Sequence, residues 1–136
     1  MTKLAAPATL LAASAAALLS CAETQSLGPT VNEPLPEAVG RCAQTTITQT
    51  GSRLEGTSPY DSGSNVNFSN GGYQVTYGSV DGIIHSQVGD PVRMCLVEIP
   101  QGCPPGDDRG RVYTTTNLRT GESWRLANAS HGCGGP

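Results

Sequence analysis

Lysine is almost absent from this chain, and basic residues of both kinds are few. The single lysine is Lys3, and the whole chain carries eight basic residues against eleven acidic ones. After residue 20 the chain contains seven arginines, no lysine and all eleven acids, which gives a net charge of −4. Proteins that bind nucleic acid need clustered basic residues. This composition therefore argues against a nucleic-acid partner.

Aromatic residues are also scarce, with one Phe, one Trp and four Tyr in 136 residues. Such a chain supports one domain with a small core. The sequence has no Gly-x-Ser-x-Gly elbow, no P-loop and no dinucleotide-binding glycine pattern. We therefore expect a single small domain that needs no cofactor, and we expect disulfide bonds to supplement its core.

What is present begins with a secretory signal peptide over residues 1–20. Lys3 precedes an uncharged run rich in alanine and leucine, Leu4 to Leu19, and small residues follow it. The run is marginal as a transmembrane helix, because about 20 apolar residues are needed to span a bilayer and Pro7 interrupts this one. We therefore expect the chain to be exported.

The tetrapeptide Leu18-Leu19-Ser20-Cys21 resembles a bacterial lipobox, in which cleavage leaves a lipid-bearing cysteine as the first residue. The resemblance implies attachment to the membrane through acyl chains on Cys21 alone. The residue after this cysteine is Ala22 rather than Asp, which resembles lipoproteins that are sent to the outer membrane. The expected location is the cell envelope, on the periplasmic face or in the outer membrane. Conventional cleavage after Ala22 with free secretion, and an uncleaved anchor, are the alternatives.

The cysteine count agrees with lipidation. Five is an odd number for an exported protein. Assigning Cys21 to lipid leaves an even set in an oxidising compartment: Cys42, Cys95, Cys103 and Cys133.

Geometry favours one of the three possible pairings of these four cysteines. A strand from Cys95 to Pro100 spans roughly 16 Å, and three further residues return about 10 Å, whereas bridged Cα atoms must come within about 7 Å. A Cys95–Cys103 bridge is therefore disfavoured. A hairpin centred near Thr120 would bring the C-terminal tail back beside Cys103. We predict the bridges Cys103–Cys133 and Cys42–Cys95.

Two segments follow the signal peptide. Residues 21–40 contain three prolines and three acids without a regular period, which predicts an extended tether; the alternative is a segment lying across the domain surface. Residues 41–136 form the domain. Its alternating runs and turn residues, including Asn70-Gly71, predict short strands over 43–50, 65–69, 73–77, 91–100, 111–119 and 123–126. Residues 79–88 fit a helical turn or a short strand.

This pattern predicts an all-β fold: a small antiparallel sandwich or partly open barrel, OB-like or SH3-like, stapled by disulfides. The block from Gly89 to Leu126 contains the phrases GDPV, CLV, CPPGDDRGR and NLRTGESW. It resembles a group of short uncharacterised bacterial exported proteins over about half of the mature chain. The resemblance implies export and a cysteine-stapled fold, and it brings no activity with it.

One motif suggests catalysis. Ser130-His131-Gly132-Cys133 matches the SHGC core of L,D-transpeptidases, whose cysteine attacks peptidoglycan stem peptides. A nucleophilic cysteine needs a base and oxyanion donors. In this chain Gly134 replaces the basic residue that follows the family's cysteine, and His85 lies farther upstream than the family's histidine. We expect Cys133 to be structural and predict no catalytic residue.

No metal site is predicted. His85 and His131 lack the spacing of zinc ligands, and Asp107-Asp108 lack a calcium-binding loop around them. We expect these acids to pair with nearby arginines in a solvated turn. Glu98 lies inside an apolar strand and is the one carboxylate whose pKa burial could shift; the favoured interpretation is an edge-facing glutamate near Arg93 or Arg111. The candidates for a binding face are Asp107, Asp108, Arg109, Arg111 and Trp124, although the tryptophan fits core filling better.

Together these observations predict a non-enzymatic β module of the cell envelope, monomeric, with a binding or structural role. Its expected partner is an envelope protein or a peptidoglycan-related molecule. The first alternative is a lysozyme- or protease-inhibitor-like lipoprotein whose loop 103–111 plugs an active site, so that Arg109→Ala or Asp108→Ala abolishes inhibition. The transpeptidase-like enzyme is the lesser alternative.

Overall fold

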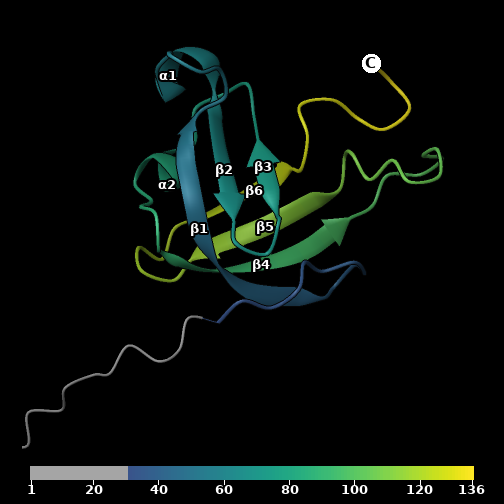
Figure 1. Cartoon of the computed structure of the whole chain (residues 1–136), viewed down its shortest axis with the longest axis horizontal. Helices are drawn as coiled ribbons and strands as arrows, with labels where there is room; N and C mark the ends of the chain where they lie inside the picture. The colour runs from purple at the N-terminus through teal and green to yellow at the C-terminus, as the bar shows by residue number, and fades with distance from the viewer. Residues whose placement is uncertain (1–30) are drawn as a thin grey trace, which may run out of the picture.

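Six antiparallel strands form one curled sheet, a half-barrel, in the computed structural model (Figure 1). The structure describes residues 31–136; the predicted signal peptide, Cys21 and residues 22–30 of the predicted tether lie outside the described residues. The elements are β1 (Cys42–Ser52), α1 (Pro59–Ser62), β2 (Ser64–Phe68), β3 (Tyr73–Val75), α2 (Asp81–Ile84), β4 (Pro91–Glu98), β5 (Val112–Asn117) and β6 (Ser123–Ala127).

The sheet consists of two three-stranded meanders joined along β1 and β4. Its strand order is β3-β2-β1-β4-β5-β6. β1 pairs with β4 through residues 42–46 and with β2 through residues 47–52, and its register shifts between Ile47 and Gln49. Such an irregularity bends a strand, and here it lies where β1 passes from one meander to the other. The predicted all-β fold is confirmed as a partly open barrel rather than a two-sheet sandwich.

Alternation along the strands places the core on the concave side of the sheet. On β4, Val92, Met94 and Leu96 are fully buried, whereas the residues that alternate with them are exposed or only partly buried. They pack with the remaining members of the core cluster, which are Ile47, Val66, Phe68, Ile83, Tyr113 and Trp124. Residues 79–88, for which the sequence left two possibilities, contain the helical turn α2. Its Ile83 caps this core.

Gln74 links the two ends of the curled sheet. It is fully buried on β3, and its Nε2 donates to the backbone oxygens of Tyr113 (2.8 Å) and Leu126 (3.1 Å). Its Oε1 accepts from Thr115 Oγ1 (2.7 Å) and Trp124 Nε1 (2.9 Å). A buried amide with every group hydrogen-bonded costs little and specifies one arrangement. The side chain thus holds β3 against β5 and β6, where the two strand edges have no backbone ladder.

The segment from residue 31 to residue 40 lies along the domain. Glu33 N donates to Gln44 O (2.8 Å), and Tyr113 Oη donates to Pro36 O (3.3 Å). Leu35 packs against the core cluster. For these ten residues the arrangement corresponds to a segment across the domain surface and differs from a free tether. No helix within residues 31–136 is long and apolar enough to cross a membrane.

Both predicted disulfides are present. Cys42 and Cys95 face each other in the β1–β4 ladder, with their Cα atoms 3.9 Å apart. Cys103 and Cys133 join the β4–β5 loop to the C-terminal tail, with their Cα atoms 5.4 Å apart. Two disulfides in a small domain indicate an oxidising, extracytoplasmic environment.

Candidate functional site

The Asp107–Arg109 pair ties the β4–β5 loop to the tail. Arg109 donates from Nε to Asp107 Oδ1 (2.9 Å) and from Nη2 to Oδ2 (2.8 Å). The same guanidinium donates to the backbone oxygens of Gly135 (2.9 Å) and Pro136 (3.3 Å), while Gly134 N donates to Asp107 Oδ2 (3.0 Å). These donors hold the pKa of Asp107 well below its usual range, with Arg109 as the first cause. Both side chains are therefore occupied within the chain.

The neighbouring candidates form a second, looser pair. Arg111 Nη2 lies 2.9 Å from Asp108 Oδ1, and the Asp108 side chain is 66% exposed. Asp108 is thus the acid of the predicted binding loop that remains turned to solvent. The pairing of these acids with Arg109 and Arg111 matches the solvated turn expected from the sequence.

Trp124 lies in the core and Glu98 is exposed, which are the alternatives that the sequence favoured for these two residues. Trp124 belongs to the core and is not part of an exposed face, because its indole fills the concave side of the sheet and its Nε1 bonds to Gln74. Glu98 is exposed at the end of β4 and lies 3.2 Å from Arg125 Nη2. The buried carboxylate of this domain is Asp90, which the sequence reasoning missed.

Asp90 anchors a cluster at the other end of the sheet. Arg119 donates from Nε to Asp90 Oδ1 (2.6 Å) and from Nη2 to Oδ2 (2.9 Å). Asn117 Nδ2 and the backbone nitrogen of Gln87 each donate to Oδ2 at 2.8 Å. Led by Arg119, these bonds lower the pKa of Asp90 from 3.8 to about 2 against the opposing effect of burial. The cluster joins the loop before β4 to the β5–β6 turn, which is a structural role.

The histidines and Cys133 are not brought together. His85 Nδ1 lies 2.9 Å from Glu122 Oε1 at the β5–β6 turn, and His131 lies beside Tyr77. Cys133 is bonded to Cys103, so the free thiol that a transpeptidase-like mechanism requires is absent here. Among the residues that the structure describes, no group of three His, Cys, Asp or Glu side chains could hold a metal ion.

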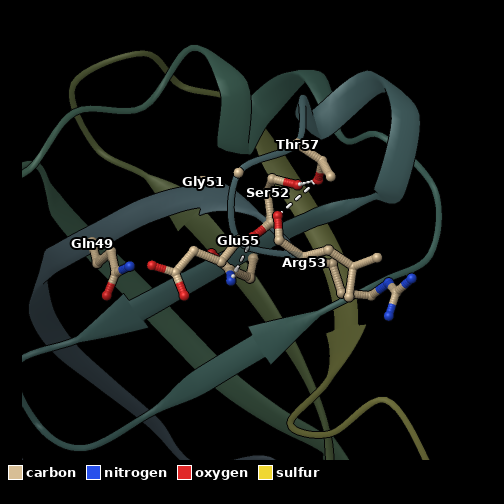
Figure 2. Close-up of a pocket in the computed structure, with 9 residues that line it drawn as sticks. Gln49, Gly51, Ser52, Arg53, Glu55 and Thr57 are labelled. Atoms are coloured by element: carbon tan, nitrogen blue, oxygen red, sulfur yellow. Dashed lines mark hydrogen bonds between the residues drawn. The ribbon is translucent and has the colours of Figure 1, made fainter.

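The sequence reasoning also missed a polar concavity of about 460 Å³ at the end of β1. Figure 2 shows Gln49 and Glu55 pointing toward each other across it, while the Arg53 side chain extends away. Its wall is formed by the end of β1, the loop that leads to α1 and one residue of β2, namely Gln49, Gly51, Ser52, Arg53, Leu54, Glu55, Gly56, Thr57 and Asn65. The sequence analysis left these loop residues between the predicted strands 43–50 and 65–69 without a role.

Hydroxyl groups fix the loop that forms this wall. Ser52 Oγ bonds to Thr57 Oγ1 (2.6 Å) and to Ser62 Oγ, and Thr57 Oγ1 donates to Leu54 O (2.7 Å). Gly63 follows α1 with φ +93°, and a Cβ there would lie 2.0 Å from the Thr76 carbonyl oxygen. Only glycine fits this close approach without strain. The backbone of the concavity is therefore pre-formed.

A cation–aromatic cluster flanks the concavity. The Arg53 guanidinium lies 4.2 Å from the ring centroid of Tyr77, and its Nε donates to Ser62 O (2.8 Å). Tyr77 Oη lies 3.4 Å from His131 Nε2, and Tyr77 is 57% exposed. These contacts direct Arg53 away from Glu55, and no salt bridge to Glu55 is formed by the residues that the structure describes.

Asn65 contributes an unsatisfied acceptor to the wall. Its Nδ2 donates to Ser52 O (3.0 Å), which fixes the orientation of the amide. Its Oδ1 is buried and has no hydrogen-bond partner within residues 31–136. Gln49 Oε1 already accepts from Asn67 Nδ2 (3.4 Å), so the exposed Glu55 carboxylate is the acceptor that the concavity presents to solvent. The arrangement suits ligands that present hydroxyl, amide or ammonium donors.

Comparison with known proteins supplied no relative: no family model, curated protein or solved structure is significantly similar to this chain.

Proposed function

We propose that this protein is an exported, non-catalytic binding module of a bacterial cell envelope. It acts at the concavity between β1, the β1–α1 loop and β2, and its partner is an envelope protein or a peptidoglycan-related molecule. The proposed location in the cell envelope rests on the signal-peptide pattern of residues 1–20 and on the lipobox-like Leu18 to Cys21. Cys21 would carry the lipid anchor, and the domain would act as a monomer outside the cytoplasm.

One observation carries the binding role: the backbone of the concavity is held rigidly while its outward side chains are left available. Ser52, Thr57 and Ser62 bond to one another within the loop. In the described part of the chain, the Glu55 side chain has no hydrogen bond or ion pair. A pre-formed site with free polar groups loses little entropy when it binds. Glycan strands and stem peptides present hydroxyl and amide donors that match the Glu55 carboxylate.

Site-specific photo-crosslinking in intact cells tests the proposal. A photoreactive amino acid at position 55 of the full chain should give discrete adducts with the partner. The control is position 98, which carries another exposed glutamate at the opposite end of the sheet and should give none. With the partner identified, Glu55→Gln should weaken binding about tenfold, because a charged hydrogen bond is lost. A folded protein that gives no adduct from position 55 would contradict the proposal.

The inhibitor-like alternative is favoured by the β4–β5 loop. Cys103–Cys133 and the Asp107–Arg109 pair hold that loop to the tail, and Asp108 extends from it, 66% exposed. A rigid loop with one exposed carboxylate is the form expected of an inhibitor loop that inserts into the active site of a hydrolase. Position 108 in the same crosslinking series separates the two candidates, because adducts from 108 and not from 55 support the inhibitor.

A further inference from the structure

The Cys42–Cys95 disulfide lies on the convex face of the sheet, where solvent can reach it. Its neighbours Ala43 and Met94 are buried on the concave side, and alternation therefore turns the two sulfur atoms outward. Both cysteines are only partly buried. The bridge crosses the β1–β4 ladder, which is the junction between the two meanders.

A cation lies against one of its two sulfur atoms. Arg93 Nη1 is 3.2 Å from Cys95 Sγ, on the same strand and the same face. No corresponding contact involves Cys42 Sγ among the described residues. A guanidinium beside sulfur stabilises a thiolate, and a stabilised thiolate leaves faster in thiol–disulfide exchange. The two sulfurs are therefore unequal: Cys95 is the better leaving group, and Cys42 is the sulfur to be attacked.

Space for an attacking thiol lies beside Cys42. A concavity of about 570 Å³ is formed by residues 33–38 and 41–43, including Cys42 itself. The segment 31–40 forms one wall, held by the bond from Glu33 N to Gln44 O. β2 does not extend along this part of β1, because it pairs only with residues 47–52. A small thiol therefore has a path to Cys42.

The other disulfide lacks this arrangement. Cys103 Sγ lies 3.8 Å from the carbonyl oxygen of Pro100, whose partial negative charge opposes a thiolate. The residue after Cys133, Gly134, bonds to the carboxylate of Asp107. Neither sulfur has a cation at hydrogen-bond distance among the described contacts. The surroundings of Cys103–Cys133 favour a bridge that persists.

We propose that Cys42–Cys95 is an exchangeable disulfide and that Cys42 accepts an external thiol. The incoming thiolate attacks Cys42 Sγ, a new sulfur–sulfur bond forms, and the Cys42–Cys95 bond breaks. The electron pair of the broken bond stays on Cys95 Sγ, which leaves as a thiolate beside Arg93. One thiolate is consumed and one is formed, so the step needs no oxidant. A monothiol leaves a mixed disulfide on Cys42, and a dithiol attacks its own mixed disulfide and releases both cysteines.

The test follows both bridges of the intact protein in time. Samples treated with dithiothreitol are quenched with acid, alkylated and mapped by mass spectrometry. Cys42 and Cys95 should be alkylated at least about tenfold faster than Cys103 and Cys133. With limiting glutathione, the mixed disulfide should map to Cys42. Faster opening of Cys103–Cys133, or glutathione on Cys95, would overturn the proposal without any variant.

Arg93→Gln tests the leaving-group role. It should slow the opening of Cys42–Cys95 roughly threefold, because the neutral amide stabilises the thiolate less. The matched control is Arg125→Gln, which removes the same charge from the same face of the sheet and should leave the rate unchanged. Circular dichroism checks that both variants are folded. Equal rates for the two variants would show that Arg93 plays no part in the exchange.

Discussion

Two aspartate–arginine pairs, at opposite ends of this domain, differ in burial although their chemistry is the same. In each pair the guanidinium donates two hydrogen bonds to the carboxylate. The Asp90 side chain is 6% exposed and the Asp107 side chain 18%, and Asp90 has further bonds from Asn117 and Gln87. Asp107 instead holds a loop and a tail at the surface. The Asp90 pair therefore joins segments around the core, whereas the Asp107 pair holds a loop to the tail at the surface.

The difference is energetic as well as geometric. A pair at the surface, such as Asp107–Arg109, gains less than a buried one, because water can solvate its partners when they are separated. Removing the buried Asp90 leaves the buried Asn117 amide and the Gln87 N–H without their common acceptor, although Arg119, which is 43% exposed, can be solvated. We therefore expect the domain to depend strongly on Asp90 and weakly on Asp107, and three measurements test this ranking.

The largest effect is expected for Asp90→Ala. The substitution deprives Arg119, Asn117 and the Gln87 backbone of their common acceptor. We expect the free energy of unfolding to fall by about 3 kcal/mol, a large share of the stability of a small domain. Urea unfolding of the protein with both disulfides intact measures it.

Asp90→Asn is the control for that substitution, since it keeps the volume and one acceptor oxygen but removes the charge. It should destabilise the domain less than Asp90→Ala. A loss below about 1 kcal/mol for Asp90→Ala would mean that the buried cluster is not an anchor.

The pH dependence of stability gives the next largest effect. Folding lowers the pKa of Asp90 from 3.8 to about 2, so the unfolded chain binds the proton more readily than the folded one. The contribution of Asp90, about 2 kcal/mol, is complete above about pH 5 and is lost as the pH falls through 3.8 toward 2. Unfolding midpoints of the wild type should therefore decline more steeply across this window than those of Asp90→Asn. Parallel curves would contradict the assignment.

The smallest effect is expected for Asp107→Ala. The tail stays attached through Cys103–Cys133, and the freed Arg109 becomes solvated. The unfolding midpoint should move by a small fraction of the Asp90→Ala shift, whereas the Gly134 amide, which loses its acceptor, should exchange with solvent faster. Hydrogen exchange followed by NMR separates this local change from global destabilisation. A midpoint shift as large as that of Asp90→Ala would remove the distinction between the two pairs.

The features that the sequence predicted depend on neighbours along the chain. The alternating pattern predicted a strand over 91–100, which contains β4, and Asn70-Gly71 identified the β2–β3 hairpin. The reach of an extended chain excluded a Cys95–Cys103 bridge, and both predicted disulfides are present. The Asp107–Arg109 pairing could also be predicted from the sequence, because only one residue separates the two.

The features that the sequence left hidden depend on contacts between distant segments. Asp90 and Arg119 are 29 residues apart, and Gln74 reaches Leu126 across 52 residues. In the sequence, Asp90 and Gln74 resemble ordinary polar surface residues. The concavity beside Glu55 was equally invisible, since it depends on hydroxyl bonds that fold the 51–63 loop onto itself.

The amino-acid sequence alone determined an all-β domain, the positions of its strands and the pairing of its four domain cysteines. These follow from side-chain alternation, turn chemistry and chain length, which are local properties. Only the tertiary structure decided that Asp90 is buried, that Gln74 joins the ends of the sheet, and that Arg93 lies against Cys95. The physical reason is that burial, and with it the strength of a polar contact, is set by which segments the curled sheet brings together.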